Sequence, residues 1–600
     1  MSPTTKRSSE QTPLLAETSA RRSSQDSQRL AEEEDAAIHG TPLPAERKRS
    51  SRELFLFSWA FLATAAVIVL TVVLQHRNST SSAPAIPTIP GDPATGDPYT
   101  TKSSLKKDRK RNLVFMVSDG MGPASLSLTR SFRQHVSKLP MSDTLTLDKH
   151  FWGSSRTRSS NSWVTDSAAG ATAFSCARKS YNGAIGMEPG FKPCGTVLEA
   201  AKRAGYKTGL VVTTDITDAT PACFASHVAY RWQMDEIALQ EIGEGVLGRS
   251  VDLMLGGGRC HFLPNTTAGS CRLDDVDVVG IAKEKHGWGY VDDRSGFDSL
   301  KLGKNAKLPL LGLFAPRDVP FEIDRSKMAD TYPSLSEMAT TALEALEEAT
   351  KDSEQGFFLM IEGSRIDHAG HINDPAAQVR EVLEYDKTFQ TVLDFIKSSD
   401  TETVLVATSD HETGGLSTAW QAHNELPVYN WHPQILANAN ASSEYLALLL
   451  GERIATTPDS YLSLVEWIKT DLVQNKLGIS DALEIEINAL ASNPAAAQTI
   501  FARMVSIRAR IGWSTHGHSA VDVNVYSSGG PGTEKIRGNV ENIEVGGFLN
   551  EYLGVDLEPI TKELREKMEQ EEVDVVATQE EDGVVGMDKV HPLEWVGLSL

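Results

Sequence analysis

The sequence predicts an α/β fold with a large, mostly parallel central sheet flanked by helices, and one N-terminal transmembrane helix. Five short runs of apolar, often β-branched residues cover 112–120, 206–215, 252–258, 356–363 and 403–410, and a sixth strand is expected at 522–527. Continuous apolar runs are typical of strands buried on both faces of a parallel sheet. Helical stretches at 196–204, 333–349 and 461–473 alternate with or follow these runs. This alternation predicts a doubly wound domain.

The composition limits what this 600-residue chain can be. It has 80 Asp plus Glu against 58 Lys plus Arg, a formal net charge of −22. Such acidity excludes a nucleic-acid binder with a basic face. A mean hydropathy of −0.25 excludes a polytopic membrane protein but is compatible with a single span. The 5 cysteines are too few for a scaffold built from disulfides.

Residues 54–74 form an uncharged run without Gly or Pro. The run is long enough to cross roughly 30 Å of hydrocarbon as a helix; a buried core helix is the alternative. Basic residues cluster at 47–52, and Arg77 is the nearest one after the run. The positive-inside rule therefore predicts that residues 1–53 are cytosolic and that the chain beyond the span lies on the other side.

The predicted cytosolic tail, residues 1–53, has a composition typical of disorder. Within it, Glu10 precedes the pair Leu14 and Leu15 by four residues. This pattern resembles the acidic dileucine signal by which adaptor complexes sort cargo to lysosomes or vacuoles. Residues 75–111, rich in Pro and Ser and then basic, are interpreted as a stalk.

The folded domain is expected to span residues 112–570. Insertions are expected at about 265–330 and 421–512. Residues 571–600 are rich in acidic side chains and are interpreted as an exposed tail, a candidate propeptide for a lumenal protease.

Two kinds of modification are compatible with a lumenal address. Asn265 and Asn440 lie in sequons for N-glycosylation. Two disulfides are possible, Cys260 with Cys271 and Cys176 with Cys194. The sequence alone establishes neither pairing.

Carboxylates follow several of the predicted strands. Asp119, Glu362 and Asp410 lie at the ends of three runs, and open α/β sheets bind their ligands beyond the carboxyl ends of the strands. Asp367 and His371 are four residues apart, so a helix would place them on one face. A salt-bridged helix start is the alternative explanation of this spacing.

Histidines occur beside the same segments. His411 directly follows a carboxylate, and His516 and His518 precede the strand expected at 522–527. Imidazole and carboxylate groups together bind Zn²⁺. Such groups at the ends of separate strands fit a multi-metal site better than scattered surface charge.

Four further residues suggest phosphate chemistry. Ser167 opens a run of small residues, where it could simply cap a helix, but a metal nearby would activate its hydroxyl for attack. Asp218 and Thr220 offer oxygen ligands of the kind that suit Mg²⁺. Arg231 could bind a phosphate through two parallel hydrogen bonds.

Five motifs now carry a family resemblance: TDSAAGATA, DATPA, EGSRIDHAGH, TSDHETGG and HSAVDVNVY, in this order. Over residues 112–555 the chain resembles the alkaline phosphatase family. With the N-terminal span and the dileucine pattern, it is most similar to the fungal vacuolar type. The resemblance implies a homodimeric phosphomonoester hydrolase in the vacuolar lumen, anchored as a single-pass type II membrane protein. It also implies two Zn²⁺ and one Mg²⁺ per subunit, and a phosphoserine intermediate.

The resemblance also implies a role for each site residue. Ser167 would be the nucleophile, and Arg231 would bind the phosphoryl oxygens. The first zinc would be held by Asp367, His371 and His518, the second by Asp119, Ser167, Asp410 and His411, and the magnesium by Asp119, Asp218, Thr220 and Glu362. His516 competes with His518 for one position, and the register of HSAVDVNVY favours His518. His368 occupies a position that varies within the family, and with Asp218 it would tune the third metal site.

Two rival functions remain. A phosphodiesterase or nucleotide pyrophosphatase of the same superfamily commonly uses a threonine nucleophile and lacks the third-metal set of Asp218, Thr220 and Glu362. A catalytically silent membrane-anchored ectodomain would show gaps in the ligand set, and the sequence shows none. The setting of Ser167 also lacks the Cys/Ser-x-Pro-x-Arg pattern of sulfatases.

Overall fold

The computed structural model describes residues 109–581, with side-chain surroundings up to residue 570. The predicted membrane span, the sorting signal and all but the last residues of the stalk lie outside the described residues. Within 109–581, no helix combines the length and the apolar character needed to cross a bilayer.

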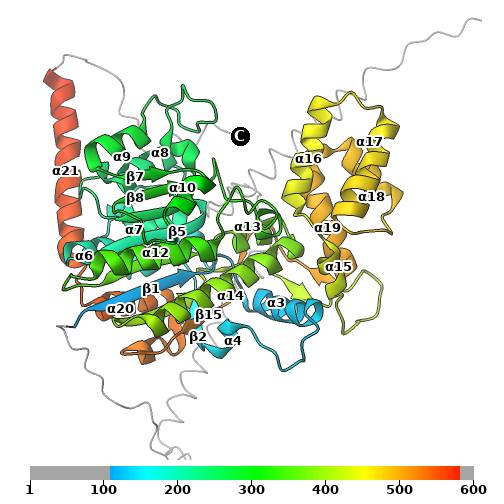
Figure 1. The fold of residues 1–600 in the computed structure, drawn as a ribbon, viewed down its shortest axis with the longest axis horizontal. Helices are drawn as coiled ribbons and strands as arrows, with labels where there is room; N and C mark the ends of the chain where they lie inside the picture. The colour runs from blue at the N-terminus through cyan, green and yellow to red at the C-terminus, as the bar shows by residue number, and fades with distance from the viewer. Residues whose placement is uncertain (1–108, 582–600) are drawn as a thin grey trace, which may run out of the picture. The chain divides into compact units, whose positions relative to one another are not determined.

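A ten-stranded sheet forms the centre of the described chain, in the order β16-β2-β15-β10-β1-β9-β5-β6-β8-β7 (Figure 1). Its strands are β1 (Arg111–Val117), β2 (Phe151–Arg156), β5 (Lys207–Asp215), β6 (Leu253–Gly257), β7 (Gly289–Val291), β8 (Leu310–Leu313), β9 (Phe357–Glu362), β10 (Glu402–Thr408), β15 (Val523–Ser527) and β16 (Gly538–Glu541). Only β15 runs antiparallel to its neighbours in this sheet. The predicted mostly parallel sheet is therefore confirmed.

The five predicted apolar runs become the adjacent strands β10, β1, β9, β5 and β6. Val114 of β1 pairs with Leu405 on one side and with Leu359 on the other. Alternate residues of β1 enter two separate cores, Leu113 and Phe115 in one, and Val114 and Met116 in the other. Apolar side chains are thus needed on both faces, which explains why the runs do not alternate with polar residues.

Helices cover both faces of this sheet (Figure 1). Around the sheet lie α3 (Pro123–Val136), α4 (Thr146–Lys149), α5 (Ser167–Cys176), α6 (Val197–Arg203), α7 (Ala219–Ala225), α8 (Met234–Leu239), α9 (Val278–His286), α10 (Arg294–Ser299), α11 (Glu322–Arg325), α12 (Leu335–Thr350), α13 (Arg365–His371), α14 (Pro375–Ser398), α20 (Asn542–Leu553) and α21 (Glu558–Glu581). Helices α12 and α14 pack with Val114 and Met116, and α6 and α20 pack with Leu113 and Phe115.

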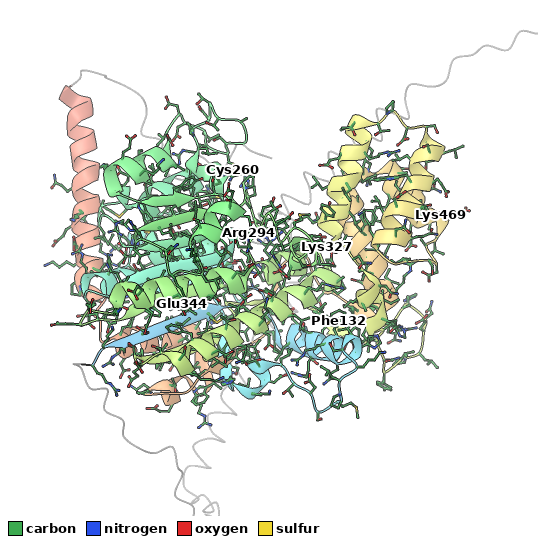
Figure 2. The ribbon with its side chains drawn as sticks, in the orientation of Figure 1. Phe132, Cys260, Arg294, Lys327, Glu344 and Lys469 are labelled. Carbon is green, nitrogen blue, oxygen red and sulfur yellow. A yellow bond between two sulfur atoms is a disulfide. The ribbon has the colours of Figure 1, made fainter. Side chains whose placement is uncertain are left out.

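The predicted insertion at 421–512 contains a separate group of helices, called here the helical lobe. It comprises α15 (Pro433–Asn438), α16 (Ser443–Thr456), α17 (Tyr461–Trp467), the π-helical segment η3 (Ile468–Lys476), α18 (Glu484–Ser492) and α19 (Ala497–Ala509). Leu446, Leu472 and Phe501 share its core with Phe132 of α3 and Val379 of α14. Figure 2 labels Phe132 near the base of the lobe and Lys469 on the lobe itself.

The other predicted insertion, 265–330, takes part in the central sheet. It supplies β7 and β8, which extend the sheet beyond β6. At the C-terminus, α21 continues to Glu581, past the predicted domain boundary at 570. Residues 582–600 of the predicted tail lie outside the described residues.

Candidate active site

The carboxyl ends of the central strands bring the predicted acids together. β1 lies between β10 and β9 in the sheet, so Asp119, Asp410 and Glu362 follow or end neighbouring strands. Asp218 follows β5, the next strand, and caps α7 by accepting a hydrogen bond from the Ala219 amide at 2.7 Å. This is the strand edge at which parallel α/β sheets bind ligands.

A short ribbon carries the last histidine into this cluster. β11 (Glu412–Thr413) pairs antiparallel with β14 (His518–Ser519), so that Thr413 lies opposite His518. The rings of His411 and His518 stack with centroids 3.5 Å apart. His518 Nδ1 lies 2.8 Å from the carbonyl oxygen of Thr165, which directs Nε2 toward the other ligands.

Asp367, His371 and His518 form the first predicted ligand set. On α13, His371 Nε2 lies 3.2 Å from Asp367 Oδ2, as the spacing of four residues predicts. His518 Nε2 lies 3.1 Å from His371 Nε2 and 3.6 Å from Asp367 Oδ1. His518, and not His516, groups with Asp367 and His411 as possible ligands of one ion; His516 is exposed, and its Nδ1 lies 2.7 Å from the backbone oxygen of His371.

The second predicted set surrounds Ser167. Its Oγ lies 3.0 Å from His411 Nε2, and that nitrogen lies 3.1 Å from Asp410 Oδ2 and 3.5 Å from Asp119 Oδ1. Asp119, Asp410 and His411 are mutually close enough to hold one metal ion. The structure thus gathers all four predicted residues around one point.

The third predicted set is buried at the end of β9 and the start of α7. The carboxylate of Glu362 accepts a hydrogen bond from Ser364 Oγ at 2.6 Å. Thr220 Oγ1 is buried and has no hydrogen-bond partner among the described residues. Together with Asp218, these oxygens match the oxygen-only chemistry that Mg²⁺ prefers.

Local structure explains why Ser167 reaches this cluster. Asp166 caps α5 by accepting a hydrogen bond from the Ala169 amide at 3.0 Å, which makes Ser167 the first residue of the helix. A Cβ on Gly170 would lie only 3.0 Å from Cβ of Asp410. The small residues of this motif therefore let α5 approach the end of β10 closely.

Two carboxylates hold Arg231, and one of them, Asp166, directly precedes Ser167 in the sequence. Its guanidinium lies 2.9 Å from Asp218 Oδ1 and 3.5 Å from Asp166 Oδ2. Burial lowers the pKa of Arg231, but these two carboxylates more than compensate and raise it overall. The side chain remains 30% exposed, so a phosphoryl group could reach it.

The acids of the cluster differ in how far the protein stabilises their charge. Burial raises the pKa of Asp367 and Asp410, but nearby histidines lower it more. Burial, followed by the neighbouring carboxylates of Asp410 and Asp367, raises the pKa of Asp119 well above its ordinary value. Burial raises the pKa of Glu362 to about 8. Asp119 Oδ1 and Asp410 Oδ2 are both buried, and one ring nitrogen, His411 Nε2, lies 3.5 Å from the first and 3.1 Å from the second. Buried carboxylates in this state need cations, so the donor set fits bound metals.

His368 lies outside the ligand sets. Its Nδ1 is 3.1 Å from Asp318 Oδ2. Burial lowers the pKa of His368, but Asp318 raises it more, to about 9. Asp318 also accepts a hydrogen bond from the Asp215 amide at 3.2 Å, which links His368 to the end of β5.

The sequence analysis did not identify Thr413 as a site residue. Its hydroxyl donates a hydrogen bond to Asp367 Oδ1 and lies 3.2 Å from His411 Nδ1. It therefore orients members of both zinc sets. The available signal was its position two residues after His411, where the side chain of an extended strand returns to the same face.

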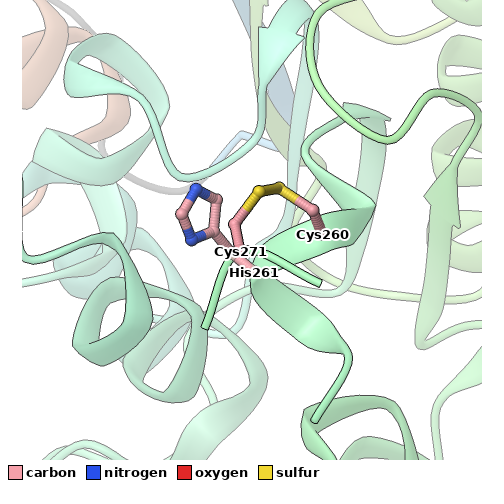
Figure 3. Close-up of side chains that lie close together, drawn as sticks. All are labelled: Cys260, His261 and Cys271. Carbon is pink, nitrogen blue, oxygen red and sulfur yellow. A yellow bond between two sulfur atoms is a disulfide. The ribbon is translucent and has the colours of Figure 1, made fainter. Parts of the chain in front are cut away.

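The structure forms both candidate disulfides, Cys176–Cys194 and Cys260–Cys271, and leaves Cys223 free and buried. His261 lies beside the second disulfide (Figure 3). The three side chains Cys260, His261 and Cys271 are close enough to hold a metal, but the bond between the two sulfurs removes both thiolates. The two sequon residues, Asn265 and Asn440, are exposed.

A serine at a helix N-terminus, surrounded by carboxylates and imidazoles at a sheet edge, defines a hydrolase site of the metal-assisted phosphoryl-transfer class. The family model described as alkaline phosphatase matches residues 110–555. The repressible alkaline phosphatase of Saccharomyces cerevisiae is 54% identical over 76% of this chain and 84% of its own length. The alkaline phosphatase of Schizosaccharomyces pombe is 47% identical over 78% of this chain and 85% of its own.

Solved structures agree with this similarity. The cold-active alkaline phosphatase of Shewanella sp. is 29% identical with a TM-score of 0.61, and the match covers 74% of this chain and 99% of that one. A histidine-to-glutamate variant of the Antarctic TAB5 alkaline phosphatase, with Mg bound in its M3 site, is 26% identical over 75% of this chain and 100% of that one, with a TM-score of 0.51. The chain belongs to the alkaline phosphatase family, a family of metal-dependent hydrolases, and is an alkaline phosphatase of the fungal repressible type.

Proposed function

We propose that this alkaline phosphatase hydrolyses diverse phosphomonoesters in two steps through a phosphoserine at Ser167. The contact between Ser167 Oγ and His411 Nε2, at 3.0 Å, carries this proposal. It places a hydroxyl at the N-terminus of α5 inside the buried cluster of carboxylates and imidazoles. The positive end of the helix favours an anionic oxygen there.

The metals proposed are two Zn²⁺ and one Mg²⁺ per subunit. Asp367, His371 and His518 would hold one zinc, and Asp119, Asp410, His411 and Ser167 the other. Asp218, Thr220, Glu362 and Asp119 would hold the magnesium; the TAB5 variant, with Mg in its M3 site, supports a site of this kind. When bound, these ions supply Lewis-acid activation of the serine and leaving oxygens and neutralise phosphoryl charge.

The residues of the chain then perform two displacements. In the first, Ser167 Oγ forms a bond to phosphorus while the bond to the ester oxygen breaks and the alcohol leaves. In the second, water attacks the phosphoserine, the bond between Oγ and phosphorus breaks, and phosphate is released. Arg231, held in place by Asp218 and Asp166, would bind the phosphoryl oxygens through its planar fork of donors in both steps.

The experiment is a set of measurements on the full chain purified with its metals. We expect zinc and magnesium in a ratio near two to one, and phosphate release from a monoester at a rate well above that from a diester. After an acid quench, mass spectrometry should find phosphate on the Ser167 peptide, and Ser167→Ala should remove that signal. Preferential cleavage of the diester would favour the phosphodiesterase alternative, and metal-loaded protein without turnover would favour the silent ectodomain.

We propose that the protein is located in the vacuolar membrane, with a type II orientation and the catalytic domain in the lumen. The apolar run at 54–74, the basic residues before it and the Leu14–Leu15 pair support this address. Two disulfides are also typical of an oxidising compartment. We propose that an adaptor complex reads the tail, that the enzyme is a homodimer, and that the acidic tail is removed by a lumenal protease.

Replacement of Leu14 and Leu15 by alanine tests the sorting step. We expect the phosphatase to leave the vacuolar membrane fraction while its activity per molecule stays the same. Retention of the double variant at the vacuole would contradict a role for the dileucine pair.

A further inference from the structure

A cavity of about 340 Å³ lies beside the histidines of the candidate active site. Its lining includes Asn373, Trp420, Arg503, Ser506, Trp513 and His516. The helical lobe contributes Arg503 and Ser506, both on α19. The cavity volume lies within the range of small-molecule binding sites.

The cavity lies on the more exposed side of the histidine cluster. The side chain of His411, next to Ser167, is 0% exposed, that of His518 is 11% exposed, and that of His371 is 39% exposed. His516, which lines the cavity, contacts the backbone oxygen of His371 at 2.7 Å. The cluster therefore opens toward solvent at the histidine that adjoins the cavity.

The same backbone segments that place the metal ligands also build the aromatic walls. β12 (Ser417–Thr418) pairs with β13 (Ile511–Gly512) just beyond the β11–β14 ribbon. The Trp420 amide donates to the Arg510 carbonyl oxygen at 2.9 Å, and the Trp513 indole donates to Ser506 Oγ at 3.0 Å. The Trp513 ring is thus held by a hydrogen bond of its own, whereas Trp420 is fixed through its backbone.

Arg503 is an exposed cation in the lining of the cavity. Within residues 109–570, whose side-chain surroundings the structure describes, it makes no hydrogen bond and no ion pair. A second cavity, of about 430 Å³, differs in this respect. There, Arg365 pairs with Glu444 at 2.8 Å and Arg317 with Asp215 at 3.3 Å. A free guanidinium beside two indoles is suited to a planar aromatic group that also carries negative charge.

We propose that this cavity binds the leaving group of a nucleoside diphosphate, with the base against Trp420 or Trp513 and the retained phosphate on Arg503. The inference rests on the proposed function, in which the terminal phosphoryl group bonds to Ser167 and the leaving group departs on the opposite side. The bond between the terminal phosphorus and the bridging oxygen breaks, and that oxygen keeps the electron pair. The nucleoside monophosphate then leaves past His371.

The test compares ADP with glycerol 2-phosphate, whose leaving group has neither a ring nor a charge. Both are assayed on the metal-loaded full chain and on Arg503→Met, with Arg503→Lys as the conservative variant. Lys469→Met is the matched control, because Lys469 is an exposed cation of the same lobe. We expect Arg503→Met to raise KM for ADP about tenfold, the effect of one lost charge-assisted contact. Arg503→Lys should restore most of the lost affinity for ADP. Lys469→Met should leave KM unchanged for both ADP and glycerol 2-phosphate.

A second variant and a binding measurement test the cavity assignment separately from the proposed phosphatase function. Trp420→Leu should also raise KM for ADP about tenfold through lost stacking, with kcat/KM for glycerol 2-phosphate within about twofold of the parent. In the Ser167→Ala background, ADP should quench tryptophan fluorescence, and Arg503→Met should weaken that binding by the same factor. Equal effects on both substrates, or none on ADP binding, would overturn the cavity assignment. Loss of all turnover in the parent chain would instead overturn the proposed function, and the binding assay would still decide the cavity.

Discussion

The carboxyl edge of the sheet and the helical lobe differ in what they bury. The sheet edge buries Asp119, Glu362, Asp367 and Asp410 close together. The lobe buries an apolar core around Leu446, Leu472 and Leu490. Chemistry is therefore concentrated where parallel strands hold each residue in place. The lobe, inserted between His411 and His518, can change the shape around the leaving group without changing the reacting atoms.

The largest effect that separates the two regions is expected at Ser167. Ser167→Ala should lower kcat for p-nitrophenyl phosphate by at least about a thousandfold, because no other hydroxyl can take its place in the first displacement. Zinc content should stay close to that of the parent. Ser175→Ala, at a buried serine near the other end of α5, is the control and should retain activity. Substantial turnover by Ser167→Ala would refute the assignment of the nucleophile.

A core substitution in the lobe should give the opposite pattern. Leu472 is fully buried, so Leu472→Ala should lower the free energy of unfolding by about 2–5 kcal/mol through the cavity it leaves. kcat for p-nitrophenyl phosphate should remain within about twofold, since no ligand moves. Denaturant unfolding and steady-state kinetics measure both quantities, with the exposed Leu462→Ala as control. A large fall in kcat would show that the lobe supports the ligands directly.

Thr413→Val tests how strictly the sheet edge positions its ligands. The substitution keeps the shape but removes the hydroxyl that contacts Asp367 and His411. We expect kcat/KM to fall about tenfold together with a lower affinity for zinc, as for other groups that orient metal ligands. The exposed Thr418→Val, on the neighbouring ribbon, should leave both values unchanged. Unaltered zinc affinity in Thr413→Val would mean that packing alone orients these ligands.

A smaller effect is expected at a buried charged pair outside both regions. His227 Nε2 lies 2.8 Å from Glu199 Oε1. Burial lowers the pKa of His227, but Glu199 raises it more, so the net shift is above the ordinary value of 6.5. Its stabilising contribution is therefore complete below about pH 6.5 and is lost as pH rises through the folded-state value. Glu199→Gln should cost about 1–2 kcal/mol at pH 6 and less at pH 9.

Thermal unfolding of the parent and of Glu199→Gln at several pH values tests whether the cost of the substitution falls as pH rises. Glu236→Gln is the matched control, because Glu236 is an exposed carboxylate in the lining of a cavity of about 150 Å³ that Glu199 and His227 also line. A cost for Glu199→Gln that grows with pH would contradict a protonated His227.

The sequence predicted the centre of the fold better than its edges. β1, β9 and β10 each contain a continuous apolar run, so their burial on both faces is visible in the pattern. β2 and β16 are short and partly exposed, and their pairing depends on neighbours that no local pattern reveals. The sequence predicted an insertion at about 265–330, but the membership of β7 and β8 in the central sheet was not predicted.

In the candidate site, too, the sequence predicted the residues within local motifs but not the contacts between distant segments. Its ligands occur in compact motifs, and strand ends indicate where they meet. The partners of these ligands do not occur in motifs. Asp318 meets His368, and the Thr165 carbonyl oxygen meets His518, through contacts between segments far apart in the sequence. Such contacts follow from tertiary packing, which a single sequence does not display.

The chain order of the ligands has a consequence for biosynthesis. Asp119 is made first and His518 about 400 residues later, with the whole lobe translated in between. Domains fold as they emerge during synthesis, yet β1 cannot obtain its neighbour β10 before residue 408 has been translated, or the site its last imidazole before residue 518. The nascent protein therefore holds several carboxylates in an unfinished pocket for most of its synthesis. A truncated product ending before His518 would lack one complete metal position.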